Sequence, residues 1–169
     1  HILSPGLRVA VAGLTDKVLR RLGAVAGSQL ARYNEVKSYE TMNTELTQDT
    51  EREINRGKRI LEFFNQPSQY NYTVPEECLL LHVATTGLID YIEMDIVIQL
   101  KTELIDYYRN NLNRFAEMHE FLSSTGKIDD KDTTLLDQFL ESFVNESNSK
   151  AAAALKEPFV NNKISNNKK

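Results

Sequence analysis

The sequence predicts an all-α protein, folded as a bundle of amphipathic helices that are connected by short turns. Two observations support this prediction: apolar residues recur at spacings of three and four along most of the chain, and the alternation typical of strands is almost absent. A chain of 169 residues can also bury one substantial core. We expect a helical bundle over residues 14–145, preceded by an extended segment at residues 1–13 and followed by a polar C-terminal arm at residues 146–169.

The first helix is expected to run from Thr15 to about Asn43. Its apolar positions are Val18, Leu22, Val25, Ala26, Leu30, Tyr33, Val36 and Tyr39. Gly23 and Gly27 interrupt this pattern, and each weakens the helix by about 1 kcal/mol relative to alanine. Because glycines four residues apart more often permit close helix packing than bind phosphate, we expect a packing role for both.

A second helix is expected to begin at Thr47, whose hydroxyl can cap the first turn, and to end at Pro67. The start of a third helix is clearer, because Thr73 and Glu76 have the spacing of a capping box. Pro75 then lies in the first turn, where its missing N–H loses no hydrogen bond. The apolar residues that follow are predicted to face the core: Leu79, Leu80, Val83, Leu88 and Ile89.

The longest amphipathic pattern, at residues 94–122, predicts one continuous helix that ends before Gly126. The last helix of the bundle is predicted after an acidic stretch at residues 129–132, with an apolar face that ends at Phe143.

The C-terminal arm changes in character after Asn145. Residues 151–154 could extend a helix, but Pro158 is expected to stop it, because proline removes a hydrogen bond inside a helix. Residues 161–169 are polar and low in complexity. We therefore expect a flexible arm that becomes ordered only against a partner.

The composition excludes several classes of partner and site. The formal net charge is -4 and the chain has no basic stripe, so nucleic acid is not expected as the main partner. No apolar run approaches the roughly 20 residues that span a bilayer, so membrane contact is expected only through other proteins. One cysteine, Cys78, cannot form an internal disulfide or a cysteine-cluster metal site.

The chain opens at His1 without an initiator methionine, so we expect a processed chain or a piece of a longer one.

No catalytic residue and no metal site are predicted. The chain contains no phosphate-gripping GxxxxGK[ST] motif. Cys78 and His82 lie at helical spacing without a third orienting group, so we interpret them as core residues rather than as a nucleophile pair. The acidic stretch at residues 129–132 lacks the ligand ladder of a calcium hand. Like Glu76 and Glu77, it is interpreted as a helix start.

Gln66 and Gln69 are the polar residues of greatest interest. A glutamine amide offers both a hydrogen-bond donor and an acceptor, and these can match the edge of an adenine. Chemistry alone supports this role weakly, because glutamines near a helix end are mostly solvated.

A series of motifs resembles the C-terminal helical domain of the α subunit of F-type ATP synthases. In order along the chain they are Leu30–Val36, Glu45–Thr50, Arg56–Arg59, the pair Gln66 and Gln69 before a tyrosine, Pro75–Glu77 with Gly87 and Asp90, and Gly126–Ile128. Their order and spacing extend the resemblance over about residues 27–143. It implies a part of the non-catalytic α subunit rather than an enzyme that works alone.

The resemblance implies an architectural and mechanical role in proton-driven ATP synthesis or ATP hydrolysis. The domain would pack under the nucleotide-binding domain and around the rotor, with the β and γ subunits and the remaining α-subunit portion as partners. ATP or ADP with Mg would be held mainly by those other chains. In the family the glutamine pair lies near the adenine, which implies Gln66 and Gln69 here, although one more residue separates them than in the family pattern. The family's arginine that reaches the β subunit has no counterpart at residues 9–13.

The resemblance also implies a location, the matrix side of the mitochondrial inner membrane. The alternative location is the cytoplasmic face of a bacterial plasma membrane. The alternative function is a helical adaptor that binds a partner helix through an exposed apolar face and has no nucleotide role.

Overall fold

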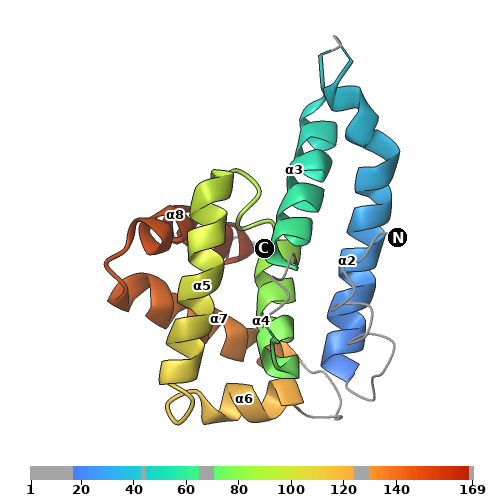
Figure 1. Ribbon diagram of the computed structural model, residues 1–169. Coiled ribbons are helices and arrows are strands. Elements are labelled where there is room, and N and C mark those ends of the chain that lie inside the picture. Colours follow the sequence, from blue (N-terminus) through green and yellow to red (C-terminus); the bar gives the residue numbers. More distant parts are fainter. Residues whose placement is uncertain (1–16, 43–44, 65–70, 124–129, 168–169) are drawn as a thin grey trace.

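The computed structural model describes residues 17–42, 45–64, 71–123 and 130–167, and the regular structure in these ranges is entirely helical (Figure 1). The elements are α2 (Lys17–Val36), the 3-10 helix η1 (Lys37–Glu40), α3 (Gln48–Phe63), α4 (Val74–Thr85), α5 (Met94–Asn110), α6 (Ala116–Ser123), α7 (Asp130–Glu146) and α8 (Lys150–Asn167). Helices α2 and α3 form a long hairpin, and α5 to α8 form the other half of the molecule (Figure 1). The all-α prediction is confirmed.

Helix α4 lies between these two halves and forms the centre of the core (Figure 1). All its residues from Pro75 to Thr85 are buried, and it contacts α2, α3, α5 and α6. The predicted capping box is present: the Glu76 amide donates to Thr73 Oγ1 at 3.4 Å, and the Thr73 amide donates to Glu76 Oε1 at 2.9 Å. These bonds satisfy two amide groups that have no partner within the helix.

The start of α3 also agrees with the prediction from its cap. The Thr50 amide donates to Thr47 Oγ1 at 3.1 Å, and Asp49 and Glu51 lie in the first turn, where the helix dipole favours negative charge. The helix ends at Phe63, and Pro67, the predicted terminator, lies outside the described residues.

Close approach of α2 and α3 depends on Gly57. A Cβ added there would overlap the side chain of Tyr33 on α2, so only glycine fits between the two helices. The packing role predicted for Gly27 is wrong, because a Cβ at Gly27 would meet nothing within 4 Å. Gly23, its predicted companion, is buried.

The predicted continuous helix over residues 94–122 is in fact two helices. Helix α5 ends at Asn110, α6 begins at Ala116, and a turn separates them. The side-chain amide of Asn111 donates to the Tyr107 carbonyl at 2.8 Å. Asparagine side chains compete in this way with the backbone bonds that would continue a helix, so the prediction of one helix is wrong.

The prediction that Pro158 ends the C-terminal helix is also wrong. Helix α8 runs through Pro158 to Asn167 and packs against α5 and α7. Its buried residues are Ala151, Ala152, Leu155 and Phe159. Burial of this apolar face stabilises the helix more than the one hydrogen bond lost at proline destabilises it.

Candidate functional site

Gln66 and Gln69, the predicted adenine-side residues, lie outside the residues that the structure describes. The preceding end of α3 is firmly anchored. Phe64, the cap of α3, is only 2% exposed, and Lys101 Nζ on α5 donates to the Glu62 carbonyl at 3.1 Å. The last turn of α3 therefore has a defined position against α5.

The first turn of α4, which follows Gln66 and Gln69 in the sequence, is anchored to α5 by the buried carboxylate of Glu76. Arg109 donates to both oxygens of Glu76, from Nε at 2.6 Å and from Nη2 at 2.9 Å. Burial acts to raise the pKa of Glu76, but the bonds from Arg109 and Thr73 outweigh it and lower the pKa below its usual range. The Glu76 carboxylate is therefore ionised at neutral pH and orients the first turn of α4.

The structure brings together motif residues that are far apart in the sequence. Arg56 on α3 donates to both oxygens of Asp90, from Nε at 3.2 Å and from Nη2 at 2.7 Å. The guanidinium lies against Gly87, whose φ of 89° is a left-handed conformation that favours glycine. Arg59 Nη2 donates to the Ile92 carbonyl at 2.6 Å. The two arginines of one motif thus fasten the α4–α5 turn, residues 86–93, to α3.

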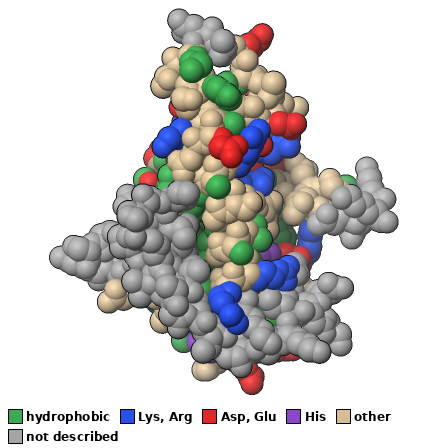
Figure 2. Space-filling view, turned by 90° about the vertical axis from the view of Figure 1, so that its right-hand side faces the viewer, with side chains coloured by type: hydrophobic (Ala, Val, Ile, Leu, Met, Phe, Trp, Pro, Cys, Tyr) green, Lys and Arg blue, Asp and Glu red, His purple; other side chains and the backbone are tan. Residues whose placement is uncertain are grey.

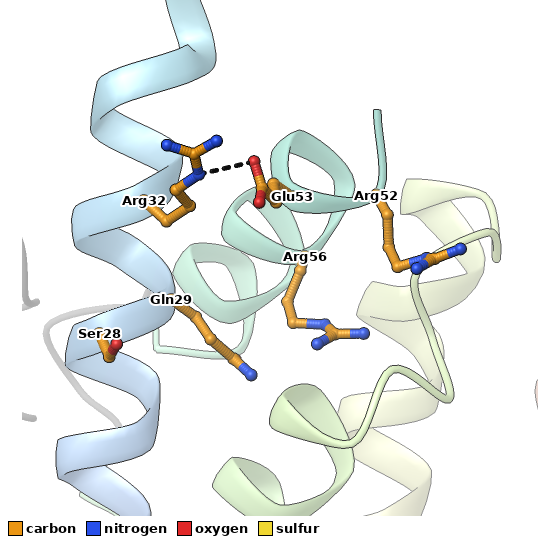
Figure 3. A pocket seen from close by; sticks show the side chains of 6 residues that line it. All are labelled: Ser28, Gln29, Arg32, Arg52, Glu53 and Arg56. Atoms are coloured by element: carbon orange, nitrogen blue, oxygen red, sulfur yellow. Dashed lines mark hydrogen bonds and ion pairs between the residues drawn. The ribbon is translucent and has the colours of Figure 1, made fainter. Parts of the chain in front are cut away.

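A cavity of about 230 Å³ lies between α2 and α3 (Figure 3). It is lined by Ser28, Gln29, Arg32, Arg52, Glu53 and Arg56. Each arginine of this lining is paired with a carboxylate of the same chain. Arg32 Nε donates to Glu53 at 2.9 Å, and Arg52 lies 3.5 Å from Asp49. Arg56 is likewise held by Asp90, so each arginine among the described residues of the lining has a carboxylate partner.

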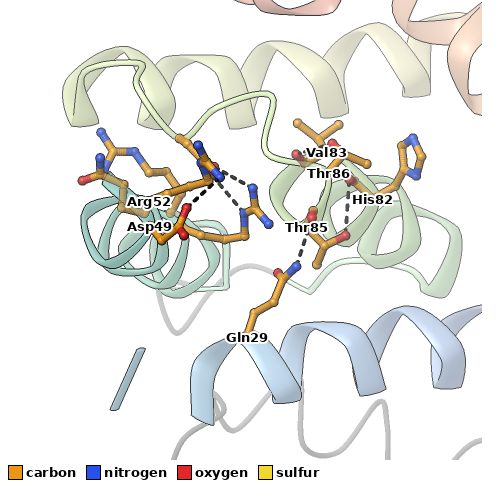
Figure 4. A network of polar contacts seen from close by, with 11 residues as sticks. Gln29, Asp49, Arg52, His82, Val83, Thr85 and Thr86 are labelled. Atoms are coloured by element: carbon orange, nitrogen blue, oxygen red, sulfur yellow. Dashed lines mark hydrogen bonds and ion pairs between the residues drawn. The ribbon is translucent and has the colours of Figure 1, made fainter. Parts of the chain in front are cut away.

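Gln29 connects this cavity to the end of α4. Its Nε2 donates to the Thr85 carbonyl at 3.1 Å, and Thr85 Oγ1 in turn donates to the Leu81 carbonyl at 2.7 Å (Figure 4). The Gln29 Oε1 atom is buried without a hydrogen-bond partner among the described residues. The arrangement positions α2 against α4.

Cys78 and His82 lie in the core, as their sequence pattern predicts. Both side chains are buried. Burial, with a smaller contribution from the charge of Arg21, lowers the pKa of His82 to about 4. His82 is therefore neutral at pH 7, and its Nε2 lies 3.9 Å from Asp137 Oδ1, beyond hydrogen-bond distance. These features favour the core interpretation over a nucleophile pair.

Glu77 is the ionisable residue whose environment the sequence does not reveal. It is only 5% exposed, and burial raises its pKa to about 7. Its Oε2 atom has no hydrogen-bond partner among the described residues. Its neighbour Glu76 has the same side chain, so only packing distinguishes the two carboxylates.

Metal sites and membrane spans are absent from the described part of the chain. No group of three or more His, Cys, Asp or Glu side chains there could hold a metal ion. No helix there has the length and apolar character needed to cross a membrane. The side chains of the acidic stretch at residues 129–132 lie outside the described side chains, although α7 does begin at Asp130.

Comparison with known proteins relates the chain to one subunit type. The ATP synthase subunit alpha of Lactobacillus johnsonii is 28% identical over 127 residues, covering 75% of this chain and 24% of the relative. The corresponding subunit of Halorhodospira halophila is 27% identical over 152 residues, covering 84% of this chain and 29% of the relative. That of Histophilus somni is 28% identical over 143 residues, covering 81% of this chain and 27% of the relative. The chain thus spans about a quarter of the length of the curated relatives that it matches.

The family comparison agrees with the individual relatives. Residues 17–143 match the family described as "ATP synthase alpha/beta chain, C terminal domain". The match begins with α2 and ends in α7, so it contains the α2–α3 hairpin, the central helix and the arginine-fastened turn. The predicted resemblance to the C-terminal helical domain of the α subunit is confirmed. From α2 to α7, the chain belongs to the family of C-terminal domains of ATP synthase alpha/beta chains.

Proposed function

We propose that this chain is the C-terminal helical part of the non-catalytic α subunit of an F-type rotary ATP synthase. The family match over residues 17–143 is the observation that carries this proposal, and the relatives named ATP synthase subunit alpha support it. The chain supports ATP synthesis or ATP hydrolysis mechanically, while the nucleotide chemistry takes place on other polypeptides.

The ties between helices support a mechanical role. Arg56 to Asp90, Arg59 to the Ile92 carbonyl, and Arg109 to Glu76 join α3, α4 and α5 through side chains from distant parts of the chain. A body that transmits force between a rotor and a nucleotide site must resist sliding of its helices. Bidentate arginine–carboxylate pairs fix both position and angle, and therefore suit this task.

The α2–α3 hairpin is the part that we propose contacts the rotor. It projects from the rest of the molecule (Figure 1). Near its tip Tyr39 is 45% and Met42 is 52% exposed, and hydrophobic side chains gather there in Figure 2. Side chains of both charge signs intermingle along the same face in Figure 2, so no single-sign field covers it. An apolar tip on a charged stem suits contact with another subunit.

Assembly with ATP synthase subunits tests the proposal. A tagged chain, recovered from native extract of its source cells, is expected to bring β-like and γ-like subunits and the remaining α-subunit portion, identified by intact-complex mass spectrometry. Recovery of the chain without any of these subunits would contradict the proposal. It would favour the helical adaptor instead.

Cell fractionation tests the location. We propose a complex bound to a membrane through its other subunits, on the matrix side of the mitochondrial inner membrane. The bacterial relatives support the alternative, the cytoplasmic face of a bacterial plasma membrane. The membrane fraction that contains the assembled complex distinguishes the two locations.

Gln66 and Gln69 are proposed to contact the adenine of ATP or ADP. The nucleotide and its Mg would be bound mainly by other chains. The double variant Gln66→Ala, Gln69→Ala is expected to lower nucleotide occupancy of a non-catalytic site, because each lost hydrogen bond costs about 1 kcal/mol. Bound nucleotide is measured in the purified complex after removal of free nucleotide. Gln138→Ala on α7 is the control, and occupancy equal to that of the control would rule out the adenine role.

A further inference from the structure

Helix α8 belongs to the fold but lies beyond the family match. The match ends at residue 143, whereas α8 occupies Lys150–Asn167 and packs on α5 and α7. Leu155 is fully buried and Phe159 is 4% exposed. The helix is thus an integral part of this molecule, and the surface that it creates is additional to the surface of the matched domain.

Helix α8 and the α4–α5 turn together form a groove of about 400 Å³. The turn contributes Leu88, Tyr91 and Ile92, and α8 contributes Ala154, Glu157 and Pro158. Leu88 and Ile92 are almost fully buried, whereas Tyr91 is 62% exposed. The groove therefore has apolar side chains in its interior and an aromatic ring at its edge.

The wall formed by the turn is held in place before any partner binds. The two residues that flank Tyr91 in the sequence are both bonded to α3. Asp90 accepts from Arg56, and the Ile92 carbonyl accepts from Arg59. Asp90 is only 2% exposed, so its pairing with Arg56 is shielded from water. A preformed wall lowers the entropic cost of binding.

The opposite wall carries a carboxylate, and its backbone lacks one N–H donor. Pro158 has no N–H, so the carbonyl of Ala154 lacks the donor that normally comes from the residue four positions later. Both residues line the groove. Glu157, which lies between them in the sequence, is exposed and forms no ion pair with another described residue. Of the described residues that line the groove, Glu157 alone carries a charge. The wall therefore suits a positively charged donor.

We propose that this groove binds a segment of another subunit of the synthase, in which a lysine or arginine lies beside a large apolar side chain. The cation bonds to Glu157 and the Ala154 carbonyl, and the apolar side chain packs on Tyr91 and the buried floor. A second copy of this chain fits less well, because the formal net charge of the chain is -4. This inference rests on the proposed function, since that function supplies the partner.

Photo-crosslinking in the assembled complex tests the proposal. The full chain carries p-benzoylphenylalanine in place of Tyr91, and the complex is purified through a tag on its β-like subunit, so only assembled chains are examined. Irradiation is expected to join this position to a basic–apolar segment of another synthase subunit, identified by mass spectrometry. The control carries the same photoreactive residue in place of Leu112, which is 41% exposed in the turn at the other end of α5.

A charge variant then tests the recognition chemistry. Glu157→Gln is expected to lower the cross-link yield at position 91 about tenfold, because the charged acceptor of the cation is replaced by a neutral amide. Glu120→Gln on α6, also exposed, is the matched control and should leave the yield unchanged.

Four results would overturn the inference: no cross-link in the assembled complex, a cross-link to a second copy, a cross-link to a segment without a basic residue, or a yield that is insensitive to Glu157→Gln. In each case the chain is still present in the β-containing complex, so the proposed function stands. Absence of the chain from that complex would instead refute the proposed function and the inference together.

Discussion

Adjacent residues of identical type have opposite electrostatic behaviour in this protein. Glu76 meets the guanidinium of Arg109, and its pKa is lowered, whereas burial without such a partner among the described residues raises the pKa of Glu77 to about 7. The first carboxylate contributes to stability at neutral pH, because it is ionised and paired. The second opposes stability at neutral pH, because its charged form is buried.

The raised pKa of Glu77 predicts a pH dependence of stability. The folded protein holds this proton more tightly than the unfolded chain, so stability falls as pH rises from about 4.5 to about 7. The full loss is on the order of 3 kcal/mol. Glu77→Gln is expected to raise the free energy of unfolding at pH 8 by about 2 kcal/mol and to remove this slope. Urea unfolding between pH 5 and 8 measures both, with the exposed Glu120→Gln as control.

The comparison with wild type isolates Glu77. His82, whose pKa is lowered to about 4, destabilises the fold as pH falls from 6.5 towards 4, but it does so equally in both proteins. A Glu77→Gln variant with the slope of wild type would show that Glu77 is ionised in the fold.

Arg56 is expected to be far more important for stability than its neighbour Arg52. Arg56→Ala leaves the nearly buried Asp90 without its partner and should cost about 3 kcal/mol. Among the described residues, Arg52 is paired only with the exposed Asp49 at 3.5 Å, so Arg52→Ala should cost no more than about 0.5 kcal/mol. Chemical denaturation of the two variants measures the difference, and equal losses would contradict the structural role of the Arg56–Asp90 pair.

At the scale of elements, the α2–α3 hairpin shows how one residue type can have opposite roles. A side chain added at Gly57 would overlap Tyr33 of the facing helix, whereas one added at Gly27 would meet open space. A glycine in a helix interior is costly on its own because of backbone entropy. A glycine inside a helix therefore benefits the structure only where a neighbouring group fills the space that its Cβ would take.

The same substitution should therefore have opposite signs at these two positions. Gly27→Ala is expected to stabilise the protein by about 0.5–1 kcal/mol through better helix propensity. Gly57→Ala is expected to destabilise it by about 1–3 kcal/mol, because the new methyl group overlaps Tyr33. Thermal unfolding monitored by circular dichroism measures both shifts. Stabilisation by both substitutions would show that α2 and α3 are less closely packed than described.

At the scale of the whole molecule, α8 completes the core that α5 and α7 begin. Its inner face joins the same cluster of buried residues as the central helix α4. The half of the molecule that contains α5 and α7 therefore depends on a helix that lies outside the family match.

Substitutions on the two faces of α8 test this dependence. Leu155→Ala removes a fully buried side chain and is expected to cost about 2–5 kcal/mol. Val160→Ala, at a position that is 41% exposed, should change stability by no more than about 0.5 kcal/mol. Both are measured on the 169-residue chain by urea unfolding. If Leu155→Ala had no effect, α8 would be the partner-dependent arm that its polar composition predicts.

Part of the site was accessible from the sequence and part was not. The motif pattern predicted the family, and it included Arg56, Gly87 and Asp90 as separate motif residues. It did not predict that these three residues meet, because 34 positions separate Arg56 from Asp90. Nothing in a single sequence relates a guanidinium to a particular distant carboxylate. The role of Gln66 and Gln69 stays a prediction.

The sequence by itself determined the all-α class, the starts of α3 and α4, and the core position of Cys78 and His82. These features follow from apolar periodicity and from caps that act within one helical turn. Only the tertiary structure decided that a helix continues through Pro158, that the pattern at residues 94–122 divides at Asn111, and that Glu77 differs from Glu76. The division at Asn111 involves a local side-chain bond to the Tyr107 carbonyl, which the apolar pattern does not reveal. The other two outcomes depend on burial or on a bond to another part of the fold, and packing energies of several kcal/mol outweigh local preferences of about 1 kcal/mol.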